Sequence, residues 1–349
     1  MKKATQIIGM MCMAAVLVVG ASSCNKENKT VSSFVFNLPA IEGENPFDDS
    51  KAYIDMVANS MKWYEGDQMM VYTIDEDITK SKAAVFTAES NVTGQSWVQF
   101  NGSAMEEGSE GFFAFYPASK ATTEITTGNR AYFNVDATQT HEVDLFANTA
   151  RAGRIFMDPR GFVGAATCDV IEPNVNADLN HIFGYINVRI KDTDNSDRNL
   201  KSVTITDEHM HLTGGISILI PALKSADLDA MKQLGVNYKS NGDAEAYTAG
   251  LQSKLQEIGY MSEPDGNSVT LTVAGPANDG FGTQIDGSYK YFLMPLRPGA
   301  LMNGFTVTLS FMGDEPDMVI NVPADKKYIS IPGYYTNVSI DLKNGGMVL

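Results

Sequence analysis

The sequence is poor in cysteine and tryptophan: its 349 residues include three cysteines and two tryptophans. Cys12 and Cys24 lie near the start, so Cys168 alone remains in the body of the chain and has no partner there for a disulfide. Small exported domains use disulfides when their cores are too small, but this chain is long enough to do without them. A single cysteine can be a nucleophile, although a small buried hydrophobic side chain is its commoner role.

Long apolar runs are also absent beyond the first residues. The one run, Ile7–Gly20, is shorter than the roughly 20 residues of a membrane helix. It follows Lys2 and Lys3 and precedes small residues, an order typical of a secretory signal peptide over residues 1–23. We therefore expect no transmembrane helix after export.

Cys24 directly follows these small residues, as in a bacterial lipobox. This predicts cleavage between Ser23 and Cys24, palmitate-type lipidation of Cys24, and anchoring in the cell outer membrane by acyl chains. Ala21 stands where many lipoboxes have leucine, and an ordinary cleaved signal that leaves Cys24 at the N-terminus is the alternative. The polar residues 24–30 would form a tether.

Positive charge is scarce, with 26 Lys and Arg against 42 Asp and Glu and a net charge of −16. Loss of Lys2 and Lys3 with the signal gives −18 (−16 minus 2). Such acidity argues against nucleic acid and anionic membranes as partners. It favours solubility in an exposed location.

Motifs for catalysis are missing too. No G-x-S-x-G elbow, P-loop or dinucleotide fingerprint occurs. His209 and His211 would share one face of a strand and could bind a metal, but no third ligand follows at a zinc-site spacing, which favours solvated histidines. We predict no catalytic residue, no metal and no cofactor, and hence not an enzyme. A carboxylate pair of the glycosidase type cannot be placed from sequence.

Residues 192–197 begin like a calcium loop. That loop needs glycine at its sixth position and glutamate at its twelfth, where this chain has Asp197 and Val203. A polar hairpin turn is therefore the favoured interpretation.

What the chain has in abundance is period-two alternation, which indicates half-buried strands. The clearest apolar series are Ile186, Val188 and Ile190; Phe305, Val307, Leu309 and Phe311; and Val338, Ile340 and Leu342. Shorter strands are expected at 33–38, 68–74, 83–87, 97–100, 111–116, 131–135, 203–205 and 269–273, the last after a turn at 264–267. The fold class is all-β, with antiparallel sheets packed as sandwiches.

The length suggests two domains. We place the boundary in the polar stretch 172–177, which gives an N-terminal β-sandwich over 31–173 and a C-terminal one over 174–349. Helical spacing of Leu251, Leu255 and Ile258 predicts a short helical insertion over 226–259 in the second domain. It would cover a sheet edge or bind a partner.

Three segments in order resemble the fimbrillin family of Bacteroidota, in its Mfa-like branch, whose members are type V pilus subunits. They are WYEGDQMMVY at 63–72, FFAFYP at 112–117 and LNHIFGYINVRI at 179–190, and IPGYY at 331–335 also fits. The resemblance implies two transthyretin-like β-sandwiches, exported as a lipoprotein and located in the fimbrium at the cell surface.

The resemblance also implies assembly by strand exchange with other fimbrial subunits, after cleavage beyond the first strand. Mapped here, the displaced strand would be 33–38, with Phe34, Phe36 and Leu38 facing the core, and Lys51 is the proposed cleavage site. After the strand 335–342 only seven residues follow, with two glycines, a poor donor strand. This favours a tip position and adhesion, with stalk or anchor positions left open.

A surface lipid-anchored glycan-binding protein is the alternative function. Its platform would use Trp97, Tyr116, Tyr289, Tyr291, Tyr334 or Tyr335, although most aromatic residues of β proteins pack in cores. A host or glycan ligand is thus a candidate partner in either case.

Overall fold

The computed structural model describes the chain in segments. These are residues 30–37, 42–43, 63, 65–91, 95, 97–109, 111–118, 130–140, 155–156, 164–171, 174–219, 225–258, 261–273, 282–297, 299–301, 304–324, 328–343 and 347–348. The description below refers to these residues.

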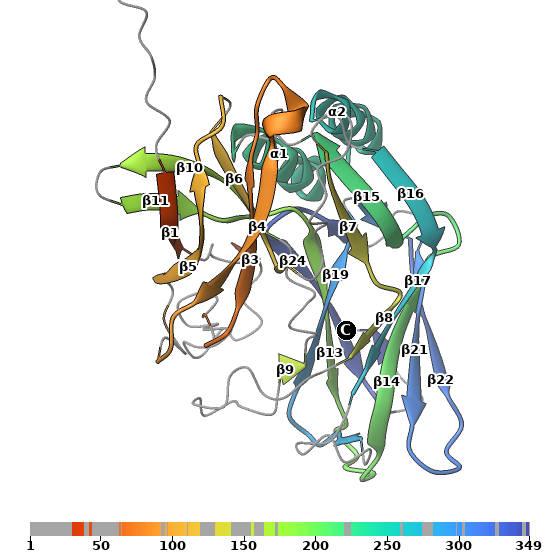
Figure 1. The fold of residues 1–349 in the computed structure, drawn as a ribbon. Coiled ribbons are helices and arrows are strands. Elements are labelled where there is room, and N and C mark those ends of the chain that lie inside the picture. Colours follow the sequence, from red (N-terminus) through yellow and green to blue (C-terminus); the bar gives the residue numbers. More distant parts are fainter. Residues whose placement is uncertain are drawn as a thin grey trace, which may run out of the picture.

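The described residues form twenty-five strands and two α-helices, arranged as Figure 1 shows. The strands up to the midpoint are β1 Thr30–Asn37, β2 Glu42–Gly43, β3 Gln68–Thr73, β4 Lys82–Ala88, β5 Trp97–Glu106, β6 Phe112–Tyr116, β7 Arg130–Val135, β8 Thr138–Thr140, β9 Ile155–Phe156, β10 Gly164–Ile171, β11 Asn174–Asp178, β12 Asn180–His181 and β13 Gly184–Lys191. The later strands are β14 Asn199–Thr206, β15 Thr213–Leu219, β16 Met261–Gly266, β17 Ser268–Thr272, β18 Thr283–Gln284, β19 Lys290–Leu296, β20 Gly299–Leu301, β21 Phe305–Phe311, β22 Met318–Val322, β23 Tyr328–Ser330, β24 Tyr334–Asp341 and β25 Met347–Val348. A 3₁₀ turn spans Ile78–Lys80, and the helices are α1 Ser225–Asn241 and α2 Ala244–Glu257.

Strands of the second half, joined by the short strands β2, β8 and β9, form a β-sandwich at the end of the molecule away from β1 (Figure 1). One sheet has the order β2-β24-β13-β19-β9 with β25 added to β24, and the facing sheet has the order β22-β21-β14-β17-β8 with β18 added to β14. Alternate residues of both sheets, such as Val188 and Val338 against Val203 and Val307, meet in one buried core. The period-two pattern of the sequence therefore marks the buried face of each strand.

Strands of the first half form a sheet that closes on itself. The order is β11-β1-β5-β4-β3-β6-β10, and β10 pairs with β11 to complete the ring. Its interior is filled by large apolar side chains, among them Phe34, Phe86, Phe100 and Phe112, all essentially inaccessible to solvent. We call this element the closed sheet.

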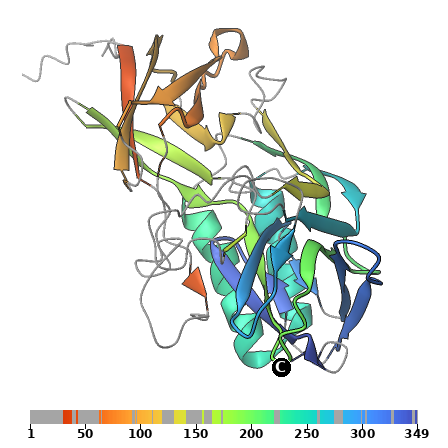
Figure 2. The same ribbon diagram turned by 90° about the horizontal axis from the view of Figure 1, so that it is seen from below.

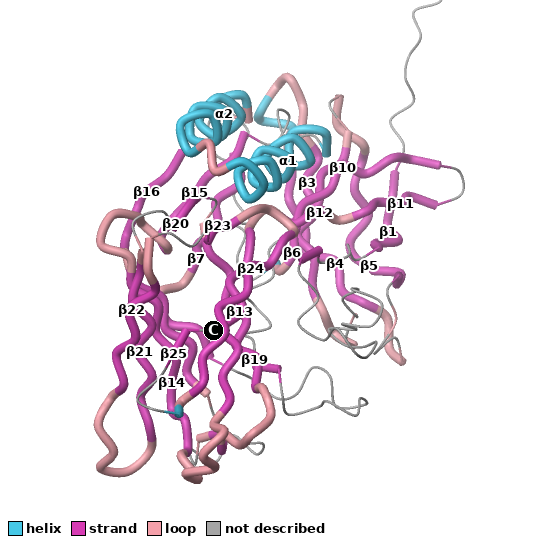
Figure 3. Tube along the Cα trace, turned by 180° about the vertical axis from the view of Figure 1, so that it is seen from behind, coloured by secondary structure: helices cyan, strands magenta, loops and turns pink. Residues whose placement is uncertain are grey.

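A third core joins the two halves. Outward-facing residues of β3 and β6, such as Tyr72 and Phe115, pack against β7 and β15 and against both helices. Met231 of α1 and Leu251 of α2 are buried in this core, and the helices lie over it in Figures 1 and 3. The helical insertion therefore covers this core, and α1 lies against β12 and β23.

The predicted all-β class is confirmed, and each strand expected in the first half from 33–38 to 131–135 has a counterpart. The turn expected at 264–267 is placed partly wrong, because Pro264 and Gly266 lie within β16, which pairs with β15. The two-domain division at 173/174 stays a prediction. Strand pairs cross that position: β11 pairs with β1, and β7 pairs with β15.

Candidate functional site: the slot of the first strand

β1 occupies a place between two strands of the closed sheet. It runs antiparallel to β5 and parallel to β11, so ladder pairs form along both of its edges. Phe34 pairs with Phe100 across β5 and with Val175 across β11. The most N-terminal strand of the described residues is therefore an interior member of a ring, where it forms backbone hydrogen bonds along both edges.

Two side chains of β1 fill the interior of the closed sheet. Phe34 makes edge-to-face contacts with Phe86 and Phe112, at ring-centroid distances of 4.8 and 5.2 Å. Phe36 meets Phe100 in the same way at 5.4 Å. Each buried phenylalanine contributes about 1.5–3 kcal/mol by area, before the aromatic geometry is counted. The prediction that Phe34 and Phe36 face the core is thus confirmed.

Trp63 holds the same strand from a second direction. Its indole Nε1 donates a buried hydrogen bond of 3.1 Å to the carbonyl oxygen of Phe36. The indole is fully buried and contacts the rings of Phe100 and Tyr116 at 4.8 and 5.1 Å. Trp63 therefore binds the backbone of β1 directly, in addition to the two neighbouring strands.

The first two motifs of the resemblance meet at Trp63. The Tyr116 hydroxyl donates to Asp67 Oδ1 at 3.1 Å, which links the end of β6 to the turn before β3. Burial, together with the Asp67 carboxylate, raises the pKa of Tyr116 well above its usual range, so the hydroxyl keeps its proton. Gly66 forms the turn with a φ of +85°, a conformation that favours glycine. The two motifs are therefore in contact, through the Tyr116–Asp67 hydrogen bond and the packing of Tyr116 on Trp63.

The third and fourth motifs meet at another junction. A Cβ added to Gly184 would lie 2.3 Å from the backbone nitrogen of Ile331, so only glycine lets these segments touch. Gly333 has a φ of +69° and donates its N–H to the Phe183 carbonyl at 3.0 Å. These motif residues thus have packing and backbone roles.

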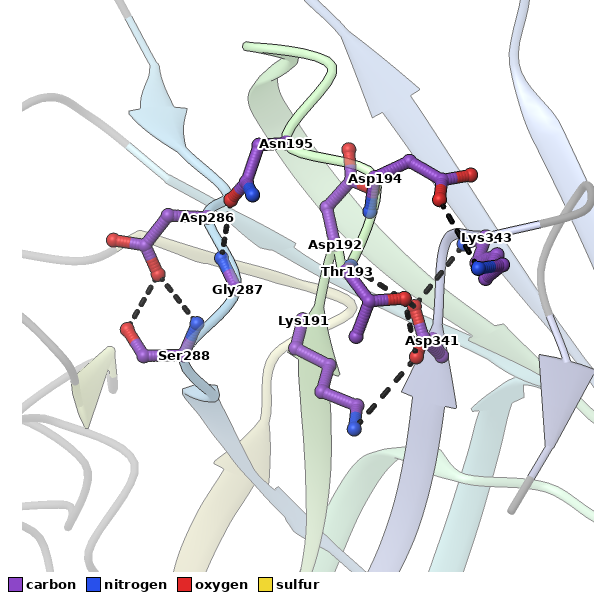
Figure 4. Close-up of polar contacts among 10 residues, drawn as sticks. All are labelled: Lys191, Asp192, Thr193, Asp194, Asn195, Asp286, Gly287, Ser288, Asp341 and Lys343. Carbon is purple, nitrogen blue, oxygen red and sulfur yellow. Dashed lines mark hydrogen bonds and ion pairs between the residues drawn. The ribbon is translucent and has the colours of Figure 1, made fainter.

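Three carboxylates, Asp192, Asp286 and Asp341, organise the loops at the far end of the sandwich (Figure 4). Asp341 accepts hydrogen bonds from the backbone N–H of Thr193 at 3.2 Å and of Lys343 at 3.1 Å, and it lies 3.7 Å from Lys191 Nζ. Asp286 accepts from the N–H and hydroxyl of Ser288, and Lys290 Nζ lies 3.1 Å away. This end is therefore a set of turns fixed by carboxylates.

These contacts lower the pKa of each carboxylate. Burial alone would raise the pKa of Asp286, but the Ser288 hydroxyl and N–H and the Lys290 ammonium outweigh it and hold the pKa at about 2. Burial is likewise outweighed at Asp192, whose pKa is lowered by the Ser196 hydroxyl and N–H. Asp192–Asp197 is thus a hairpin turn between β13 and β14, as favoured from sequence. Among the described residues, no group of three His, Cys, Asp or Glu side chains is placed to hold a metal ion.

Several predicted site residues lie outside the described residues: Ser23, Cys24, Leu38 and Lys51. Lipidation, signal cleavage and maturation at these positions stay predictions. Cys168 lies in β10, in register with Phe112. In the described part of the chain, no helix is long and apolar enough to cross a membrane.

The placement of His209 and His211 on a strand is wrong. Both residues are exposed and lie between β14 and β15. Asp207 Oδ1 accepts the N–H of His209 at 2.8 Å and of Met210 at 3.1 Å, which forms a local turn and ends the ladder. The solvated state favoured from sequence fits this exposure.

The role of Trp63 was not predicted from the sequence, where this residue stands only as the first of the motif at 63–72. The signal that could have found it is the spacing of Trp63 and Gly66, which places an indole just outside a buried strand. Of the six aromatic residues considered for a glycan platform, Tyr291 and Tyr335 are buried, and Tyr116, Tyr289 and Tyr334 are half-buried. Trp97, in contrast, is 60% exposed.

Comparison with known proteins gives structural neighbours only. No family model matches the sequence, and no curated protein matches it. A candidate cell adhesion protein from Bacteroides ovatus aligns at 14% identity and a TM-score of 0.48, over 92% of this chain and 95% of its own. A candidate cell adhesion protein from Bacteroides fragilis aligns at 10% identity and a TM-score of 0.42, over 92% and 95%. The tip fimbrial protein Mfa3 from Porphyromonas gingivalis aligns at 11% identity and a TM-score of 0.32, over 91% and 98%. All three of these neighbours are adhesion or fimbrial proteins of Bacteroidota.

Proposed function

We propose that this chain is a non-enzymatic pilus subunit, exported as a lipoprotein on Cys24 and assembled at the cell surface by strand exchange. The observation that carries the proposal is the position of β1. It is the most N-terminal strand described, yet it sits inside the closed sheet with Phe34 and Phe36 in the core. A cut after Lys51 would leave β1 attached only by non-covalent contacts.

Loss of β1 would leave an acceptor slot of defined chemistry. β5 and β11 would each present an unpaired edge, and the sites of Phe34 and Phe36 would become two pockets on alternate positions. Strand addition draws affinity from ladder hydrogen bonds and specificity from such alternate pockets. The Trp63 indole would supply one further donor to the incoming backbone. The partner in this proposal is another fimbrial subunit.

The C-terminal residues favour a tip position in the filament. β25 folds back on β24 of the same chain, with Ile340 paired to Val348 and Asp341 to Met347. These residues are therefore engaged within the chain and are not extended toward a neighbour. A subunit that accepts a strand in this state and donates none would end a filament and would carry the adhesive contact.

The test is the mature N-terminus of protein recovered from native cell surfaces, measured by intact-mass and terminal-peptide mass spectrometry. We expect filament-associated chains to begin at Ala52 and a Lys51→Ala variant to keep acylated Cys24 and stay out of filaments. Chains that begin at Cys24 within filaments would refute maturation by strand removal.

A peptide experiment tests the slot itself. Chains processed after Lys51 should bind a synthetic peptide of residues 30–37 and then fail to assemble. A matched peptide with Phe34 and Phe36 replaced by Glu should neither bind nor block assembly, because carboxylates would be placed in an apolar interior. Equal blocking by the two peptides would contradict the assignment of the slot.

A further inference from the structure

Trp97 is the most exposed large aromatic residue described in this chain. It begins β5 and is 60% exposed, whereas the other tryptophan is fully buried. Its neighbours along the strand, Val98 and Phe100, point into the closed sheet. By the two-residue period of a strand, Trp97 therefore lies on the outer surface. Figures 1 and 2 show β1, β5 and β4 side by side at the end of the molecule opposite β21 and β22.

The surface beside Trp97 is a row of polar side chains fixed by one another. Gln99 Nε2 donates to Asn101 Oδ1 at 3.0 Å, and Asn101 Nδ2 donates to Glu89 Oε1 at 2.9 Å. Thr87 lies directly across from Asn101 in the β4–β5 ladder. We call Trp97, Gln99, Asn101, Thr87 and Glu89 the polar face.

The chemistry of the polar face matches that of a carbohydrate. The negative face of an indole attracts the weakly positive C–H groups on one side of a sugar ring. An amide offers both donors and acceptors, so it can pair with hydroxyl groups in either role. The Gln99–Asn101–Glu89 chain of hydrogen bonds orients these groups before a ligand arrives, which lowers the entropy lost on binding.

The charge and the exposed apolar area of the polar face restrict the kind of ligand that it can bind. The polar face includes the exposed carboxylate of Glu89, and exposed Asp178 lies in register with Trp97 on the far side of β1. Together with the net charge of −16, these carboxylates disfavour sulfated or acidic glycans. Protein interfaces have apolar cores depleted in charge. Val85 is the only other large hydrophobic residue described as exposed on this sheet. The face therefore suits an uncharged glycan better than a protein surface.

We infer that the polar face binds an uncharged glycan chain, with one sugar ring stacked on Trp97 and neighbouring rings hydrogen-bonded to Gln99 and Asn101. From Trp97 to Asn101 the row extends about 14 Å along β5, longer than a single sugar ring. This site is present in the intact chain and does not depend on strand exchange. Its test is therefore separate from that of the proposed function.

The experiment uses the full-length chain in detergent on an array of neutral gluco-, galacto- and manno-configured glycans, with heparin as the anionic probe. We expect binding to at least one neutral glycan and none to heparin. Trp97→Ala should weaken that binding at least about tenfold, Asn101→Ala should weaken it less, and Trp97→Phe should retain most of it. The matched control is Tyr132→Ala, which removes a 39% exposed aromatic side chain from β7 and should change nothing.

Three results would overturn the inference. The first is no binding to any neutral glycan. The second is binding that Trp97→Ala leaves unchanged or that Tyr132→Ala reduces equally. The third is a Trp97→Ala chain with intact glycan binding but lost self-association, which would assign the face to a second copy of the chain. Unchanged thermal unfolding of Trp97→Ala establishes that the variant is folded, as its exposure leads us to expect.

Discussion

Replacing Phe36 with alanine tests whether β1 is held chiefly by its inward side chains. Phe36 is fully buried, contacts Phe100 at 5.4 Å and lies in the same core as Phe34. Truncation of a buried phenylalanine costs about 3–5 kcal/mol, a large part of the 5–15 kcal/mol by which domains are stable. We expect the free energy of unfolding to fall by this amount. The matched control is Val35→Ala on the outward face of the same strand, which should cost about 1 kcal/mol or less.

The two tryptophans supply an assay that reports on β1 directly. A Trp97→Phe background removes the exposed indole and leaves Trp63, whose Nε1 bonds to the Phe36 carbonyl. Departure of β1 would expose Trp63 to water and shift its emission to longer wavelength. After proteolysis beyond the strand, Phe36→Ala should weaken retention of the β1 fragment by on the order of 10²- to 10⁴-fold, the same free energy expressed as an equilibrium constant.

Two results would refute this reasoning. One is equal destabilisation by Phe36→Ala and Val35→Ala, which would mean that the backbone ladder alone holds the strand. The other is an emission spectrum of Trp63 that stays unchanged when the fragment has left. Either would show that the interior of the closed sheet is not organised around Phe34 and Phe36.

Three further predictions follow from single contacts. Trp63→Phe keeps an aromatic ring but removes the donor to the Phe36 carbonyl; we expect urea unfolding to show a loss of about 1–3 kcal/mol, against less than about 0.5 kcal/mol for surface Trp97→Phe. Gly184→Ala places a Cβ 2.3 Å from the Ile331 nitrogen and should cost about 3 kcal/mol, whereas Gly287→Ala meets its nearest atom at 3.4 Å and should cost little. The pKa of Asp286 is about 2 in the folded chain, below the value of about 3.9 in the unfolded chain. The contribution of Asp286 to the free energy of unfolding is therefore present above about pH 4 and is lost as the pH falls toward 2. Acid unfolding monitored by circular dichroism should be shallower in Asp286→Asn, and an unchanged profile would contradict that assignment.

Much of the strand content could be predicted because alternation is a local signal. Phe34 and Phe36 alternate with Ser33 and Val35, so the sequence alone indicates which side chains are buried. The same period places Trp97 opposite to Val98 and Phe100. Its exposure could therefore have been expected from its position alone.

Strand order could not be predicted in the same way. The alternation of apolar and polar residues indicates which face of a strand is buried. It does not indicate which strand lies beside it, because pairing is set by contacts between residues far apart in sequence. The β1–β11 pair, in which Phe34 faces Val175, and the β7–β15 pair that crosses the proposed domain boundary both belong to this class. The Trp63 contact joins residues 27 apart and is invisible for the same reason.

Closure of the sheet bears on when assembly would begin. An open sheet edge is a template for uncontrolled pairing with other chains. With β1 in place, the pairs from β11 to β10 leave no open edge among the strands of the ring. In the proposed mechanism, removal of β1 creates two such edges at once, at β5 and β11, and exposes two apolar pockets between them. β1 would thus prevent strand pairing with other chains during export. Cleavage by the protease, and not folding, would then determine when pairing between subunits starts. A variant that exposes this slot early, such as Phe36→Ala, should accordingly aggregate during export more than Val35→Ala does.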